Sequence, residues 1–208
     1  MKTFWNKSKT WSAFPAFMLF AAFFILNIFM NSNFLTESYL SGFLAANVPL
    51  VCISIGVAVV IMAGGIDISL GGMVCLINVI FALLIEQGVS LGLTIVICIG
   101  LSILMGAING VVIGLVRVSP MLATFAASTV YAGLALWIMP QPGGQVPIEF
   151  SMLYTGNILG IPFPLIILAG VLILSKLISR SRLGTYIMAS GANEKKAYLS
   201  CIPVDKTR

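Results

Sequence analysis

Charged residues are almost absent from long parts of this chain, and this scarcity constrains the fold more than any other feature. Asp67 is the only charged residue between Glu37 and Glu86. A helix needs roughly 20 mostly apolar residues to cross the hydrocarbon core of a bilayer. Five stretches meet this need: residues 14–30, 43–63, 91–116, 118–139 and 161–178. A sixth, residues 70–85, is shorter and can cross only by including residues from the stretch before it.

The composition excludes an ordinary soluble fold. Hydrophobic residues make up 60% of the 208 residues and charged residues 8%, whereas soluble domains average about 25% charged residues. A soluble fold of this length has too little interior to bury so much apolar surface, so its solvent must be lipid. We therefore predict an all-α, polytopic transmembrane helix bundle with about six spans, formed by residues 1–208 as a single domain.

The positive charges indicate the orientation of these spans. The net charge is +5, but Lys and Arg lie at the chain ends and in short loops rather than in one patch, so we predict no nucleic-acid partner. With a cytoplasmic N-terminus, six spans place all eleven Lys and Arg residues on the cytoplasmic side. Without the span at 70–85, Arg117 would lie outside. Both the N-terminus and the C-terminus are therefore predicted to be cytoplasmic.

Residues suited to catalysis or metal binding are scarce. The chain has no histidine, and its four cysteines lack the spacing of metal ligands: Cys52, Cys75, Cys98 and Cys201. It has neither a nucleophile with a neighbouring base nor a glycine-rich loop that would hold the phosphates of a nucleotide. The sequence therefore predicts no enzyme, no catalytic residue, no metal site and no cofactor. Any ATP would be bound by another subunit.

Asp67 lies where two glycine pairs weaken a helix. In the stretch IMAGGIDISLGG, residues 61–72, one pair precedes the acid and one follows it. Glycine allows a helix to end in a left-handed turn, and Asp67 or Ser69 can cap the next helix by accepting hydrogen bonds from its free N–H groups. We predict a helix break that acts as a structural gate, formed by Gly64, Gly65, Asp67, Ser69 and Gly71. A proton or cation coupling site and a contact with substrate or another subunit are the alternatives.

Glycines and amides also interrupt the apolar spans. Gly106, Gly110 and Gly114 recur every four residues on one helix face, a spacing that lets membrane helices pack closely within the chain or in a dimer. Asn47 and Asn109 lie inside spans, where an amide must face protein or a cavity. Such amides either join helix to helix or line a solute path.

The C-terminal stretch, residues 179–208, is the only extended polar segment. Within it, residues 193–200 predict a short amphipathic helix with Asn193 as its N-cap. Small and apolar side chains beside a polar rim suit docking into a groove of a partner protein. An interfacial loop whose lysines bind the phosphates of membrane lipids is the alternative.

Four motifs, in order along the chain, resemble those of one family. MAGGIDISLGGMVCL at 62–76 resembles the GGIDLSVGS-type signature of the permeases of ATP-binding-cassette importers for monosaccharides. This group includes ribose, xylose and galactose importers and the related autoinducer-2 importer. Three later segments are similar to the same family: GAINGVVIGLVRVSPMLATFAAS at 106–128, GIPFPLIIL at 160–168 and SRLGTYIMASGANEKKAYLSCIPVDKTR at 181–208. The resemblance covers about residues 40–208.

The resemblance implies a permease subunit, multi-pass in the bacterial cytoplasmic (inner) membrane, that imports a monosaccharide or related small polar solute. Besides membrane lipid, it implies three partners: a separate ATPase subunit that binds ATP, a second permease subunit and an extracytoplasmic solute-binding protein. Residues 181–208 would form a cytoplasmic coupling segment whose contacts with the ATPase are Gly191, Asn193, Glu194, Ala197 and Ser200. Because amides exchange hydrogen bonds with sugar hydroxyls, the solute path would be lined by Asn47, Asn78 and Asn109.

The chain also departs from the family. Members are longer, so the permease domain is expected to be incomplete at its C-terminal side, from truncation or a split gene. Met121 stands where the family has Phe, Ala126-Ala127 where it has Leu-Gly, and Cys201 and Pro203 where it has Gly and Asn. Two other functions stay open at this point. One is an ion-coupled secondary transporter that uses Asp67 and Glu86, and the other is a truncated product that inserts without completing a pore.

Overall fold

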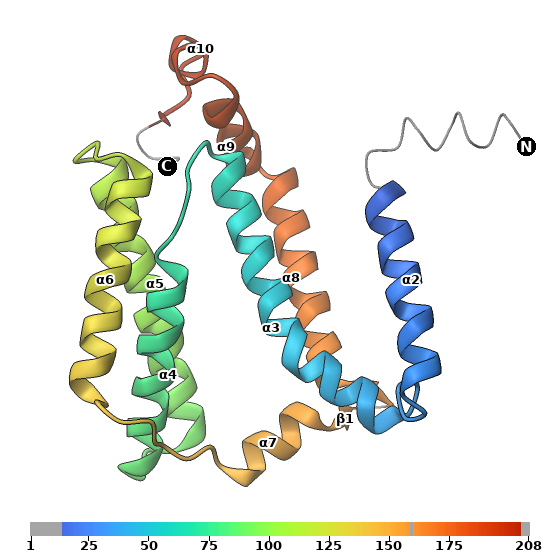
Figure 1. The fold of residues 1–208 in the computed structure, drawn as a ribbon. Coiled ribbons are helices and arrows are strands. Elements are labelled where there is room, and N and C mark those ends of the chain that lie inside the picture. The colour runs from blue at the N-terminus through green and yellow to red at the C-terminus, as the bar shows by residue number, and fades with distance from the viewer. Residues whose placement is uncertain (1–13, 159, 205–208) are drawn as a thin grey trace, which may run out of the picture. The chain divides into compact units, whose positions relative to one another are not determined.

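The computed structural model describes residues 14–158 and 160–204, and within them nine helices dominate (Figure 1). The helices are α2 (Phe14–Met30), α3 (Glu37–Met62), α4 (Leu70–Glu86), α5 (Leu91–Gly114), α6 (Pro120–Ile138), α7 (Ile148–Thr155), α8 (Phe163–Arg180), α9 (Arg182–Ala192) and α10 (Glu194–Leu199). Two short strands, β1 (Asn157–Ile158) and β2 (Ile161–Pro162), form an antiparallel hairpin with Asn157 opposite Pro162.

Six apolar helices occupy the six predicted stretches, which confirms the all-α polytopic bundle. Four of them, α3, α5, α6 and α8, are long and apolar enough to cross a membrane, whereas α2 and α4 have 17 residues each. The third predicted span forms α4, which begins at Leu70 after the non-helical stretch 64–69. That this span crosses with the help of residues from that stretch stays a prediction. The orientation of the termini stays a prediction. Lys2, Lys7 and Lys9, and residues 205–208 of the coupling segment, lie outside the described residues.

The chain divides into two compact units, with the boundary between Ala46 and Asn47 inside α3. In the first unit, Phe34 packs between Phe24 of α2 and Tyr39 of α3, with ring centroids 5.4 and 5.3 Å apart. Helix α3 begins at Glu37 rather than at the predicted residue 43 because Thr36 precedes it. The Thr36 hydroxyl accepts a hydrogen bond from the N–H of Tyr39, 3.4 Å away, and the Glu37 charge complements the helix dipole.

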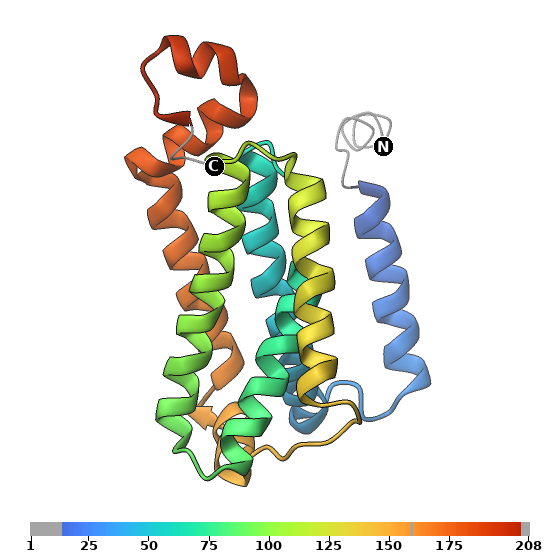
Figure 2. The same ribbon diagram turned by 90° about the vertical axis from the view of Figure 1, so that its left-hand side faces the viewer.

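The core of the second unit lies where α4 packs against α5 and α6 (Figure 2). Its centre is a cluster of buried side chains from the three helices: Leu76, Met105, Tyr131 and Ala135. The Tyr131 hydroxyl donates to the backbone carbonyl of Met105 at 3.3 Å, so the one polar atom of the cluster is satisfied. The outward faces of α5 and α6 expose large apolar side chains such as Ile103 and Trp137, which suits contact with lipid.

The two ends of the second unit carry different elements (Figure 1). At one end, Phe150 of α7 packs on Phe81 of α4, with ring centroids 5.6 Å apart. At the other end, α9 and α10 follow α8. The Asn193 side chain accepts a hydrogen bond from the N–H of Lys196 at 3.0 Å and caps α10, which confirms the predicted short helix and its N-cap. The predicted extracytoplasmic loop and the coupling segment thus lie at opposite ends of the helices.

Candidate functional site

Helix α3 ends at the predicted break in a well-formed Schellman turn. Gly64 adopts φ 81°, a left-handed conformation that glycine reaches without strain. Its N–H donates to the carbonyl of Ile61 at 2.9 Å, and the N–H of Gly65 donates to the carbonyl of Val60 at 3.0 Å. These two bonds satisfy carbonyl groups that a helix end otherwise leaves free. The first glycine pair therefore terminates the helix, as its sequence predicts.

The Asp67 carboxylate hydrogen-bonds to Ser69, the residue at the N-cap position of α4. Its carboxylate accepts the N–H of Ser69 at 2.8 Å and the Ser69 hydroxyl at 2.6 Å. Ser69 is fully buried and occupies the N-cap position, yet its side chain accepts nothing from the first turn of α4. The side-chain cap predicted for Ser69 is therefore wrong, because the Asp67 carboxylate engages the Ser69 hydroxyl in a local turn. Asp67 does accept one free N–H at the start of α4, that of the N-cap residue itself. Gly71, the remaining residue of the predicted gate, has open space where a Cβ would stand.

Thr124 of α6 holds the non-helical stretch 64–69 in place, a role that no motif in the sequence indicates. Its hydroxyl accepts the N–H of Ile68 at 3.1 Å. The same hydroxyl lies 3.2 Å from the carbonyl of Ile66 and 2.8 Å from that of Pro120, and its single hydrogen can serve one of them at a time. A threonine in a membrane helix commonly bonds the carbonyl four residues earlier, so only the fold distinguishes this one.

Asn109 connects the break to α5. It is 6% exposed, and its side-chain amide donates to the Ser69 hydroxyl at 2.8 Å. A continuous polar chain therefore runs from Asn109 through Ser69 to Asp67. The other two amides expected on the solute path lie elsewhere: Asn78 is exposed on α4, and Asn47 is half-buried in α3. Of the three, Asn109 alone lines the cavity beside the break.

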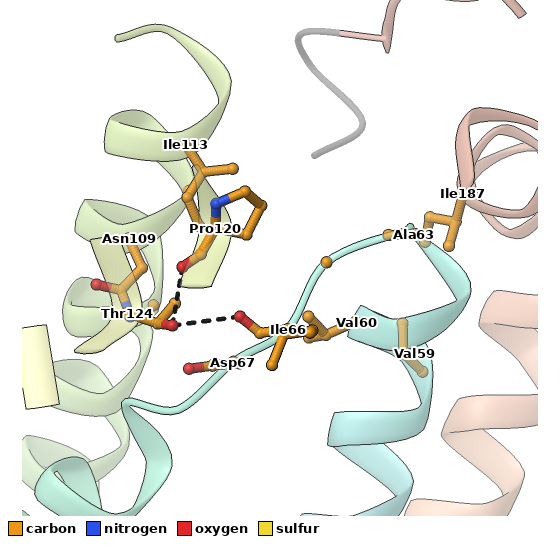
Figure 3. A pocket seen from close by; sticks show the side chains of 13 residues that line it. Val59, Val60, Ala63, Ile66, Asp67, Asn109, Ile113, Pro120, Thr124 and Ile187 are labelled. Atoms are coloured by element: carbon orange, nitrogen blue, oxygen red, sulfur yellow. Dashed lines mark hydrogen bonds between the residues drawn. The ribbon is translucent and has the colours of Figure 1, made fainter. Parts of the chain in front are cut away.

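This cavity has a volume of about 190 Å³ and two unlike walls (Figure 3). One wall is apolar and comes from the end of α3 and from α9, with side chains Val59, Val60, Ala63 and Ile187. The other comes from α5 and α6 and carries polar groups from Asn109 and Thr124. Asp67 lies on the stretch of chain that joins the walls. The cavity can therefore offer hydrogen bonds on one side and apolar contact on the other.

The glycine repeat of α5 borders this cavity instead of a neighbouring helix. A Cβ added at Gly106 or Gly110 would meet no atom within 4 Å, and both residues line the cavity. The prediction that they bring helices into close contact within the chain is therefore wrong for the described residues. Gly114, the third member of the repeat, is buried. Close backbone packing occurs instead at Gly72, whose Cβ would lie against the carbonyl oxygen of Ser128 on α6.

The residues predicted to contact an ATPase lie on α9, α10 and the turns beside them. Gly191 touches the end of α3, Asn193 caps α10, and Ala197 is the buried residue of α10, 4% exposed. Glu194 lines a groove together with Arg117, which follows α5 in a left-handed conformation with φ 60°. Ser200 is exposed after α10, next to two outward-facing apolar side chains, Tyr198 and Leu199. The structure thus gathers the five predicted residues in one region.

Comparison with known proteins adds the deciding observation. Residues 39–208 match the profile of the family described as the permease component of branched-chain amino acid transport systems. This chain belongs to that permease family. It is a multi-pass membrane protein of the bacterial inner membrane, and the family is one of transport proteins rather than enzymes.

Two curated members of known import systems are similar in sequence to this permease. It is 30% identical over 163 residues to the autoinducer 2 import system permease protein LsrD of Escherichia coli K12 and of Shigella flexneri. The alignment covers 74% of this chain and 49% of each relative, so the chain spans about half the length of the curated relatives it matches. No solved structure matches the permease. The resemblance to importer permeases, read from the motifs alone, is confirmed.

Proposed function

We propose that this chain is a permease subunit of an ATP-binding-cassette importer for a monosaccharide or a related small polar solute. The observation that carries the permease role is the family match, which extends over the helix break, the cavity and α9–α10. The four motifs that resemble monosaccharide importers support the solute class. Relatives at 30% identity are permeases of an autoinducer 2 import system. The solute of this chain is, on this proposal, a small polar molecule that a permease of this kind imports.

The chemistry of the cavity supports this class of solute. A sugar presents hydroxyl groups at its edges and C–H groups on its ring faces, and the two walls of the cavity offer partners for both. Asn109 both donates and accepts, while Asp67 accepts hydroxyl hydrogens. The cavity of about 190 Å³ is many times the roughly 10–15 Å³ that one water needs, so it has room for a small solute.

The partners follow from the same proposal. A separate ATPase subunit binds ATP and docks on α10, where Tyr198 and Leu199 are 72% and 81% exposed beside Lys195 and Lys196. A solute-binding protein delivers its cargo at the opposite end, near α7, and a second permease subunit completes the pathway. Both termini are cytoplasmic, which keeps Arg117 and the basic tail on the inner side. The chain itself holds no cofactor.

Ion coupling is the weaker alternative. It would pair Asp67 with Glu86, but Glu86 ends α4, whose 17 residues at about 1.5 Å each place it roughly 25 Å from the break. The two carboxylates cannot share an ion at that separation. The distance therefore favours an importer driven by ATP.

Uptake measurements test the proposal. The chain, as its gene encodes it, is co-expressed with the ATPase and receptor encoded beside it in a strain that lacks its own monosaccharide importers, and radiolabelled sugars are supplied. Uptake should require a hydrolysis-competent ATPase and should survive a protonophore while cellular ATP is maintained. Uptake that persists with an inactive ATPase and collapses with the protonophore would refute the proposal.

A further inference from the structure

The end of α3 and the end of α9 touch backbone to backbone. A Cβ added at Gly191 would lie against the carbonyl oxygen of Met62 and 2.9 Å from the nitrogen of Gly64. In the other direction, a Cβ added at Gly64 would stand 3.3 Å from the Cα of Gly191. Position 191 requires glycine because a Cβ there would overlap the Met62 carbonyl, and position 64 favours glycine because its φ of 81° is left-handed. Since no side chain intervenes, the contact has no rotamer freedom with which to absorb a movement of one helix against the other.

This contact makes one wall of the cavity from two elements. Of the wall residues, Val59 belongs to the last turn of α3, Ala63 directly follows that helix, and Ile187 belongs to α9. Helix α9 ends at Ala192, and Asn193 alone separates it from α10. A displacement of α10 is therefore passed to α9, and through Gly191 to the end of α3.

The opposite wall is fastened to the other side of the break. Thr124 of α6 accepts the N–H of Ile68, and Asn109 of α5 donates to Ser69. Gly65 follows α3 but is held to its end, because its N–H bonds to the carbonyl of Val60. The chain therefore passes from the α3 side of the cavity to the α5–α6 side at the peptide that joins Gly65 to Ile66. Such a short segment at the end of an element is where hinge motions are absorbed.

We propose that Gly191 is a positioning residue for transport. Through its contact with Gly64 it fixes α9 to the end of α3, so that the two move as one wall against the α5–α6 wall and change the cavity by flexing at Gly65–Ile66. This inference rests on the proposed function, since it assigns the place at which movement of the coupling segment reaches the solute.

Two cysteine tethers test the rigid wall directly. Met62→Cys with Met188→Cys joins the α3 and α9 parts of the same wall at a point outside the cavity, whereas Ile113→Cys with Ile187→Cys joins residues across the cavity. Each pair is made in full-length chain whose four native cysteines are replaced by alanine, and the assembled importer is treated with a short bifunctional thiol reagent. Peptide mass spectrometry measures the extent of cross-linking, and solute uptake is measured before and after treatment.

The same-wall tether should leave most of the uptake intact, and the tether across the cavity should lower it about tenfold or more, as expected when a closing motion is blocked. Loss of uptake with the same-wall tether would overturn the inference, because α9 would then have to move against α3. Unchanged uptake with the tether across the cavity would overturn it as well. Uptake before treatment tests the proposed function by itself, because that function requires uptake to depend on the ATPase in every variant. Failure of the proposed function is therefore distinguishable from failure of this inference.

Gly191→Ala provides a second measurement in the assembled importer. The added Cβ separates α9 from α3, so uptake per complex should fall about tenfold while ATP hydrolysis stays within about twofold. Gly170→Ala in α8, where a Cβ meets nothing within 4 Å, should change neither rate. Gly184→Ala crowds the corner between α8 and α9 instead of the end of α3, so it controls for a general packing defect. Equal losses of hydrolysis and uptake in Gly191→Ala would overturn the inference. If that variant does not assemble, the tethers decide.

Discussion

Replacing Gly72 with alanine tests how tightly α4 packs against α6, and the adjacent Gly71 supplies a matched control. A Cβ at position 72 would lie against the carbonyl oxygen of Ser128 and 3.0 Å from its Cα, whereas a Cβ at position 71 would meet nothing within 4 Å. Both substitutions add the same methyl group one residue apart in the first turn of one helix. They share the gain of roughly 1 kcal/mol that alanine brings over glycine in a helix. Their difference therefore isolates the clash with α6.

Overpacking of this kind costs about 1–3 kcal/mol because the helices must separate or bend. For a protein of this size, each kcal/mol shifts the unfolding temperature by about 2–4 °C. Gly72→Ala should therefore unfold about 2–12 °C below Gly71→Ala.

Thermal unfolding in detergent can be followed through labelling of Cys98, which is 8% exposed in α5, after Cys52, Cys75 and Cys201 are replaced by alanine. Equal unfolding temperatures for the two variants would mean that α4 and α6 are not in backbone contact at Gly72, and the packing described for the core would be wrong.

Three further substitutions test the break and the cavity. Thr124→Val should lower stability by about 1–3 kcal/mol in the same thermal assay because the Ile68 N–H loses its acceptor, while Thr124→Ser, which keeps a hydroxyl, should stay close to wild type. Gly110→Ala should reduce uptake by narrowing the cavity without lowering the unfolding temperature, and unaltered uptake would separate the cavity from the solute path. Asp67→Asn weakens the bonds to Ser69, since a neutral acceptor binds about half as strongly as a charged one. It should impair assembly or uptake more than solute binding to the receptor, and normal uptake would contradict this.

The helices were predictable because their signals are local. The apolar stretch at 14–30 coincides with α2, and the glycine pair at 64–65 ends α3 as expected. Asn193 caps α10 because the cap depends on a side chain and a backbone N–H three residues apart. Each of these features is set by neighbours in sequence, so a single sequence contains the information needed to predict it.

Contacts between distant residues were not predictable from these patterns. In a soluble helix, an apolar stripe marks the buried face, but a membrane helix is apolar on every side. The sequence therefore could not tell that Asn109 faces the cavity while Asn78 is exposed. Nor could the spacing of Gly106 and Gly110 distinguish a helix contact from a cavity wall. Nor did the sequence indicate that Gly64 contacts Gly191. These two residues belong to motifs that were predicted to act separately, one as a gate and the other as a coupling site.

The position of Asp67 in an apolar chain has an energetic explanation that needs no ion. Placing an aspartate at the centre of a membrane helix costs about 2.5–3.5 kcal/mol. Asp67 accepts two hydrogen bonds from Ser69, and bonds to a charged group contribute about 1.5–3 kcal/mol each, so they offset a cost of this size. An ion-coupled transporter would have to exchange these bonds for an ion in every cycle and leave the fully buried Ser69 hydroxyl without its acceptor. The acid is better explained as the group that holds the break closed, which leaves the energy for transport to come from a partner.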